Sequence, residues 1–179
     1  MRTSNHWISN AEVGSTSGNF GPVYNPATGE QQAQVGLASV SEVDAAVAAA
    51  KEAFTTWRSA SLSRRAEVMF AFHQLVLANR DKIAELVSIE HGKVPSDAGG
   101  ELARGIENIE FACGIPQLMK GNFSEQASTG VDVFSIRQPL GVVAGITPFN
   151  FPAMVPMWMC ANAIATGNTF ILKPSEKDP

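Results

Sequence analysis

The chain has 179 residues, of which 45% are hydrophobic and 17% charged, and its formal net charge is −4. This apolar content excludes an intrinsically disordered chain, and the 2 cysteines are too few for a disulfide scaffold. No apolar run of about 18 residues occurs, so a membrane span is not expected, and the slight acidity argues against nucleic acid as a main partner. Residues 1–6 lack the apolar core of a signal peptide, which makes a cytoplasmic or organelle-matrix location the default expectation.

The N-terminal part is predicted to form irregular β structure followed by helices. Residues 1–40 are punctuated by glycines, and residues 25–29 carry a turn signal. Ser41 and Asp44 fit a capping box, which predicts a helix that begins there and reaches Trp57. Ser63 is the predicted cap of a second helix.

Two more helical segments follow. The third is expected to run from Asp81 to His91 and to end at Gly92, a residue type that favours helix ends. The fourth covers residues 96–119 and is weakened by Gly99, Gly100 and Gly105. Arg104 lies beside one of them, so its guanidinium could clamp a substrate carboxylate, although a solvated arginine on a helix face is the simpler reading.

The C-terminal part reads as a strand, a helix and a second strand. Residues 140–146 are apolar throughout, which is typical of a strand buried on both faces of a parallel sheet. Residues 153–166 are helical in pattern, and residues 169–172 form the second apolar strand. Such a βαβ unit is expected to be parallel and right-handed, while residues 131–138 are expected to form a separate strand.

Ligands of open parallel sheets bind beyond the carboxyl ends of the strands, where this chain carries two polar segments. The first, Thr147–Pro152, presents Asn150 between two prolines, and a side-chain amide held in this way can stabilise a developing oxyanion. In the second, Lys173 and Glu176 could donate to and accept from the hydroxyl groups of a ribose. A turn-forming asparagine and an ordinary surface ion pair are the alternatives.

Several common sites are missing from the sequence. The glycine fingerprint of dinucleotide-binding domains does not occur, and no His, Cys or carboxylate pair has metal-ligand spacing, so no metal is expected. Cys113 and Cys160 both lie in helical segments among apolar residues, where thiols behave as small hydrophobic groups. Neither cysteine is expected to act as a nucleophile.

The segments Thr147–Pro152 and Lys173–Glu176, at this spacing, resemble the aldehyde dehydrogenase superfamily. The resemblance extends over the whole chain and includes Glu90–Lys93. The run 138–152, together with residues 104–107 and 110–113, is most similar to the CoA-acylating methylmalonate-semialdehyde dehydrogenases. The resemblance implies an α/β fold, namely the N-terminal part of an atypical Rossmann domain that binds NAD without the glycine fingerprint.

The same resemblance implies roles for individual residues. Asn150 matches the catalytic amide that stabilises the oxyanion, and Arg104 matches an arginine that holds the substrate carboxylate. Six residues match cofactor-binding positions: Ile146, Thr147 and Phe149 on the nicotinamide side, and Lys173, Glu176 and Lys177 near the adenosine ribose. The implied domains are residues 1–120 (N-terminal part of the NAD-binding domain), 121–139 (oligomerisation strands) and 140–179 (first βαβ unit).

The implied parent enzyme oxidises a semialdehyde to an acyl-CoA, with NAD as cofactor, CoA as co-substrate and a homo-oligomer (a dimer of dimers) as its assembly. Members of the superfamily are about three times longer than this chain, and their nucleophilic cysteine lies downstream of the matched region. The chain alone is therefore expected to be inactive. Two alternatives stay open: a non-acylating semialdehyde dehydrogenase, and a non-catalytic cofactor-binding or interaction fragment.

Overall fold

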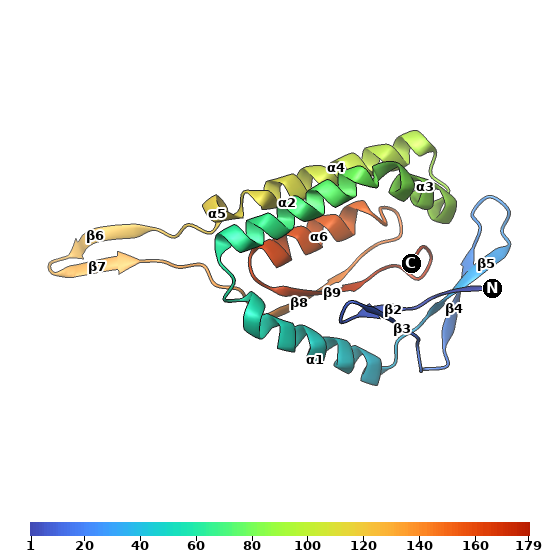
Figure 1. The fold of residues 1–179 in the computed structure, drawn as a ribbon, viewed down its shortest axis with the longest axis horizontal. Coiled ribbons are helices and arrows are strands. Elements are labelled where there is room, and N and C mark those ends of the chain that lie inside the picture. The colour runs from blue at the N-terminus through green and yellow to red at the C-terminus, as the bar shows by residue number, and fades with distance from the viewer.

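The computed structural model describes residues 1–179 and shows a small parallel sheet placed between helices. Strands β8 (Val142–Ile146) and β9 (Thr169–Lys173) pair in parallel, as the sequence predicts. Helix α1 (Val40–Trp57) packs against one face of this pair, and α6 (Met154–Ala165), which connects the two strands, packs against the other (Figure 1). The α/β fold class is confirmed.

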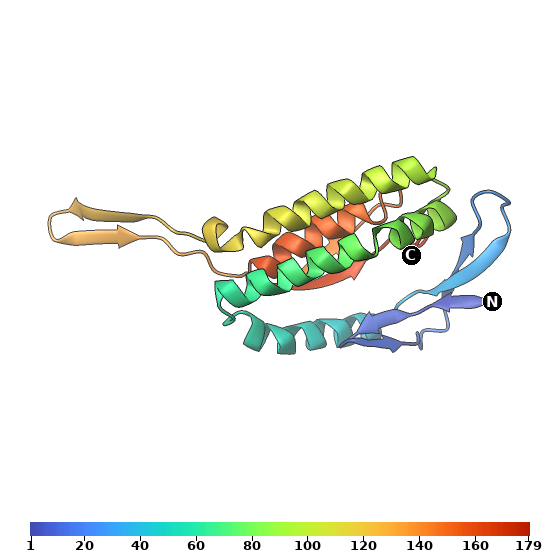
Figure 2. The ribbon, with the colours of Figure 1, turned by 45° about the horizontal axis from the view of Figure 1, so that its top comes forward.

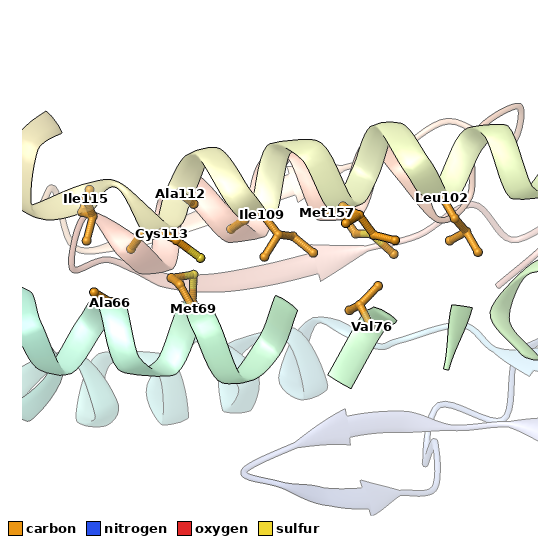
Figure 3. Packing of buried hydrophobic residues seen from close by; sticks show 12 residues of the cluster. Ala66, Met69, Val76, Leu102, Ile109, Ala112, Cys113, Ile115 and Met157 are labelled. Atoms are coloured by element: carbon orange, nitrogen blue, oxygen red, sulfur yellow. The ribbon is translucent and has the colours of Figure 1, made fainter. Parts of the chain in front are cut away.

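A layer of helices packs on the side of α6 that faces away from the sheet. Its members are α2 (Leu62–Ala78), α3 (Arg80–His91), α4 (Pro95–Cys113) and the short α5 (Ile115–Leu118). Figure 2 shows α2, α4 and α6 side by side, and the main hydrophobic core fills the space between them. The close view in Figure 3 places Met69 and Val76 of α2 opposite Ile109 of α4 and Met157 of α6.

Both predicted helix caps are displaced by two residues from the observed ones. Ser39, not Ser41, caps α1: its hydroxyl accepts from the backbone N–H of Glu42, and the Glu42 carboxylate accepts from the Ser39 N–H at 2.7 Å. The same carboxylate also accepts from the N–H of Thr16 at 2.6 Å, a tertiary contact that a local pattern does not contain. Likewise Ser61, not Ser63, caps α2 through the Arg64 N–H.

The other helix boundaries agree more closely with the predictions. Gly92 ends α3 with φ of +85°, a left-handed conformation that glycine adopts without strain, so this predicted helix end is confirmed. The fourth predicted helix is two helices, because the chain breaks at Gly114 between α4 and α5.

The N-terminal strands form two small sheets at one end of the molecule (Figure 1). Here β5 lies between β1, which is parallel to it, and β4, which is antiparallel, while β2 and β3 form a separate hairpin. The predicted turn at residues 25–29 joins β4 to β5. The strands are β1 (Arg2–Ser4), β2 (His6–Ile8), β3 (Ala11–Val13), β4 (Phe20–Tyr24) and β5 (Gln31–Gly36).

A two-stranded hairpin extends from the opposite end of the molecule (Figure 2). It consists of β6 (Phe123–Ser128) and β7 (Val131–Phe134), and every residue in both strands is exposed. The predicted strand over residues 131–138 is thus shorter than expected. Its partner β6 lies within the segment 121–139 that the resemblance implies, but the residue pattern alone does not predict it as a strand. The exposed side chains of the hairpin include Phe123 of β6 and Phe134 of β7, at 65% and 71% exposure.

The expectation that the residue 140–146 strand is buried on both faces is wrong for this chain. Ile146 is 75% exposed and Leu140 is 90% exposed. The exposed residues Ala144 and Ile146 alternate along β8 and share one face, whereas Gly145 on the other face is buried. The physical reason is that α1 packs mainly on β9 and leaves that face of β8 open. None of the helices combines the length and the apolar character that crossing a membrane requires.

Candidate active site

Two loops meet at the carboxyl end of the parallel sheet. In the register of the strands, Ile146 of β8 lies opposite Lys173 of β9. The pairing continues one step further, since the N–H of Thr147 donates to the carbonyl of Lys173 at 3.2 Å. Residues 147–153, which we call the amide loop, therefore begin beside residues 173–178, which start at the last residue of β9 and which we call the ribose loop.

The amide loop presents Asn150 to solvent between two phenylalanines. The side-chain amide of Asn150 makes no hydrogen bond within the chain, and the residue is exposed. The ammonium of Lys177, in the ribose loop, lies 4.3 Å from the ring centroid of Phe149. On the other side, the ammonium of Lys93 lies 4.1 Å from the ring centroid of Phe151. Both distances are within the range of cation–π attraction, so each phenylalanine is held by a lysine.

Beneath the amide loop lies a buried ion pair that sequence reasoning missed. The ammonium of Lys93 donates to the carboxylate of Glu101 and, at 2.7 Å, to the backbone carbonyl of Asn150. The other carboxylate oxygen of Glu101 accepts from the N–H groups of Ala153 and Met154 at 2.8 and 3.0 Å. A usable signal was present, because Glu101 lies at helical spacing within the apolar stripe of α4, where an ionised group needs partners.

The ribose loop carries an exposed ion pair. The ammonium of Lys173 donates to the carboxylate of Glu176 at 2.9 Å, and both side chains are more than half exposed. The hydrogen bond from Lys173 lowers the pKa of Glu176, with smaller contributions from the backbone and from the charge of Lys173. Glu176 is therefore an ionised acceptor at neutral pH, suited to the paired hydroxyl groups of a ribose.

Arg104 lies on α4, one helical turn after Glu101. Its guanidinium is exposed and pairs with the carboxylate of Glu107, at 2.9 Å to the nearer oxygen. The backbone carbonyl of Arg104 accepts from the indole N–H of Trp158 on α6 at 3.2 Å, which ties this turn of α4 to the helix that follows the amide loop. The neighbouring Gly105 packs against Met157: a Cβ there would lie 2.5 Å from the sulfur, so this glycine serves helix packing.

Neither cysteine has the surroundings of a reactive thiol. Cys113 is buried in the core, and burial raises its pKa. Burial likewise raises the pKa of Cys160, which is partly buried on α6. A raised pKa keeps both groups protonated near neutral pH, and the thiolate is the nucleophilic form. No group of three or more His, Cys, Asp or Glu side chains is arranged to hold a metal ion.

Known proteins similar to this chain share one family. The family profile described as "Aldehyde dehydrogenase family" matches residues 13–179, nearly the whole sequence. The chain belongs to the aldehyde dehydrogenase family. The resemblance noted in the sequence is thereby confirmed, and the amide and ribose loops are the strand-end loops of an aldehyde dehydrogenase fold.

Individual relatives show to which members of the family the chain is similar. Malonate-semialdehyde dehydrogenase of Pseudomonas aeruginosa is 51% identical over 179 residues, which cover 100% of this chain and 36% of that protein. The mitochondrial, acylating methylmalonate-semialdehyde dehydrogenase of Arabidopsis thaliana is 49% identical over 172 residues, covering 96% of this chain and 28% of the relative. The chain thus spans about a third of the length of these aldehyde dehydrogenases.

A solved structure has the same fold as this chain. The crystal structure described as a methylmalonate-semialdehyde dehydrogenase from Sinorhizobium meliloti 1021, complexed with NAD, superimposes with a TM-score of 0.97 at 52% identity. The superposition covers 100% of this chain and 36% of that one. The agreement confirms that this sequence adopts the N-terminal part of the aldehyde dehydrogenase fold.

Proposed function

We propose that this chain supplies the oxyanion-stabilising amide and part of the NAD site of a malonate- or methylmalonate-semialdehyde dehydrogenase. The observation that carries the proposal is the pairing of the amide loop with the ribose loop at one end of the sheet. The names of its relatives support the substrate class, and the NAD complex of the Sinorhizobium protein supports the cofactor.

The residues at this end of the sheet fit a nicotinamide dinucleotide. Glu176 offers an ionised acceptor and Lys173 a donor, both exposed at a strand end where such ligands bind. Ile146, Thr147 and Phe149 are the proposed lining of the nicotinamide side, and Lys177 is a further proposed contact. When bound, NAD would accept the hydride that leaves the substrate carbon.

Asn150 is the proposed catalytic residue of this chain. Its side-chain N–H₂ has no internal partner and is free to donate to the oxygen of an aldehyde as negative charge develops there. Arg104, which lies one turn from the buried pair beneath the amide loop, is the proposed partner of the substrate carboxylate. To bind a substrate, its guanidinium would exchange Glu107 for that carboxylate, and both groups are exposed enough to do so.

The nucleophile of the proposed reaction is a thiolate that residues 1–179 do not provide, because both cysteines are unsuited to the role. That thiolate would add to the aldehyde carbon, and loss of a hydride to NAD would leave a thioester. The thiol of CoA would then take the acyl group and release the thiolate. We therefore expect the 179 residues alone to show no dehydrogenase activity. The hairpin of β6 and β7 is the proposed contribution to a homo-oligomer, a dimer of dimers.

A chimera tests the proposal. Residues 1–179 would replace the matching part of the Pseudomonas malonate-semialdehyde dehydrogenase, and NADH formation would be followed with malonate semialdehyde, with and without CoA. An active chimera, in which Asn150→Ala lowers kcat by about 100- to 1,000-fold with little change in KM, is expected. Acyl-CoA in the products distinguishes an acylating enzyme from a non-acylating one.

Two outcomes would contradict this function. One is an inactive but folded chimera. The other is NAD reduction by the 179-residue chain on its own, which would mean that the chain holds a complete active site. Titration of that chain with NAD, followed by tryptophan fluorescence, tests separately whether it binds the cofactor without catalysis.

A further inference from the structure

The ion pair beneath the amide loop is the most buried one in the chain. The side chain of Lys93 is 13% exposed and that of Glu101 is 1% exposed, whereas the Lys173–Glu176 and Arg64–Glu67 pairs are more than half exposed. Burial of two charges is costly unless further hydrogen bonds satisfy them. In this pair those further bonds all go to the amide loop and to the helix that follows it.

Glu101 acts as the N-terminal cap of α6 from another helix. The residue at the cap position is Ala153, whose side chain cannot accept a hydrogen bond. The carboxylate of Glu101 accepts instead from the N–H groups of Ala153 and Met154. A negative charge at a helix N-terminus is also favoured by the helix dipole, so Glu101 fixes the point at which the amide loop becomes helix.

Lys93 holds the amide loop at Asn150, three residues before the cap position of α6. Its ammonium joins the Glu101 carboxylate to the backbone carbonyl of Asn150, while it also lies over the ring of Phe151. This carbonyl belongs to the same residue as the side-chain amide that is proposed to stabilise the oxyanion. Lys93 comes from the segment after α3 and Glu101 from α4, so two parts of the helical layer hold the loop: Lys93 at the carbonyl of Asn150, and Glu101 at the N–H groups where α6 begins.

We infer that Lys93 and Glu101 are positioning residues for Asn150, holding its peptide unit so that the side-chain amide points at the developing oxyanion. The inference rests on the proposed function of Asn150. Both side chains lie beneath the loop and make their polar contacts within the chain. Oxyanion donors act through preorganisation, and a displacement of about 1 Å can cost about 100-fold in rate, so loss of the pair would act on kcat through Asn150.

The test is a double-mutant cycle in the active chimera described above. Lys93→Met keeps the apolar stem and removes the ammonium, and it is expected to lower kcat by about 10- to 100-fold while changing KM for NAD by less than about 3-fold. In an Asn150→Ala background the same substitution is expected to lower kcat by less than about 3-fold, because the amide it positions is gone. A merely structural role would not produce this dependence on Asn150.

Glu101→Gln provides a second variant, because it keeps the side-chain volume and one carbonyl oxygen that can accept from Ala153 and Met154. Arg64→Met and Glu67→Gln, in the exposed pair on α2, are the matched controls and are expected to leave kcat unchanged. An equal loss of kcat with and without Asn150 would overturn the inference. So would insolubility of both Lys93→Met and Glu101→Gln beside soluble controls, since the pair would then serve folding alone.

An inactive parent chimera is a separate outcome. It would contradict the proposed function before any variant is made, whereas an active chimera that is indifferent to Lys93→Met would contradict only the positioning role.

Discussion

The two loops at the end of the sheet start from opposite residues of paired strands, yet they are held in different ways. The amide loop is fixed by a buried lysine and glutamate that come from other elements. The ribose loop carries its own lysine and glutamate, three residues apart and exposed. Each loop thus has one ion pair, and the surroundings of that pair decide what it contributes.

The two ion pairs differ in whether one partner can be lost or replaced. A buried pair tolerates no loss of one partner, because the remaining charge is then left without compensation, so it defines a single geometry. An exposed pair contributes little to stability, and water or a ligand can take the place of either partner. We interpret the amide loop as preorganised for chemistry and the ribose loop as free to exchange its internal contacts for those of a cofactor.

The largest expected effect concerns the buried pair. Glu101→Leu removes the acceptor of Lys93 and of two N–H groups on α6, so it should lower the free energy of unfolding by about 3–5 kcal/mol. Urea unfolding of the chain measures this. Glu67→Leu, at the exposed pair on α2, is the control and should change it by less than about 0.5 kcal/mol. Equal losses in the two variants would remove the distinction between the pairs.

Removal of both buried charges should have a smaller effect than removal of one. In the double variant Lys93→Met with Glu101→Leu, no uncompensated charge remains, and apolar side chains of similar volume often replace a buried pair at little cost. We expect the double variant to recover at least about 1 kcal/mol of the stability lost by Glu101→Leu, measured by the same urea titration. A double variant that is less stable than the single one would contradict the interpretation.

The exposed pair should show the opposite behaviour. Lys173→Met and Glu176→Gln are expected to leave the urea midpoint of the chain unchanged, because both side chains are already solvated. In the chimera, each should weaken NAD binding by about 10-fold, the loss expected for a hydrogen bond to a charged group. KM for NAD reports this loss, and Arg64→Met is the control. An unchanged KM would contradict the assignment of the ribose loop.

Sequence reasoning located the candidate site residues that follow apolar strands; their roles stay predictions. Asn150, Lys173 and Glu176 come directly after apolar strands, and the strand-end rule for parallel sheets brings them together without knowledge of the rest of the fold. The same reasoning could not connect Lys93 to Asn150, because that contact joins segments 57 residues apart. It misplaced the cap of α1 for a similar reason: two serines fit the local pattern, and the tertiary contact of Glu42 with Thr16 favours the first.

A last and smaller effect concerns Asp178, a buried carboxyl at the end of the ribose loop that lies near the charges of Glu101 and Glu90. Burial, with a smaller contribution from the two neighbouring carboxylates, raises the pKa of Asp178 from 3.8 to about 6. At a pH between these two pKa values, Asp178 is protonated in the folded chain but ionised in the unfolded chain. This group therefore makes the stability of the fold decrease as the pH rises from about 4 to about 6. Asp178→Asn removes that dependence, and its melting temperature should exceed that of the parent chain by a few degrees above pH 6 and converge with it near pH 4. Asp44→Asn, on the exposed surface of α1, is the control. A difference in melting temperature between Asp178→Asn and the parent chain that stays constant across this pH range would instead show that the carboxyl of Asp178 is solvated. Both ends of the ribose loop would then be exposed to solvent.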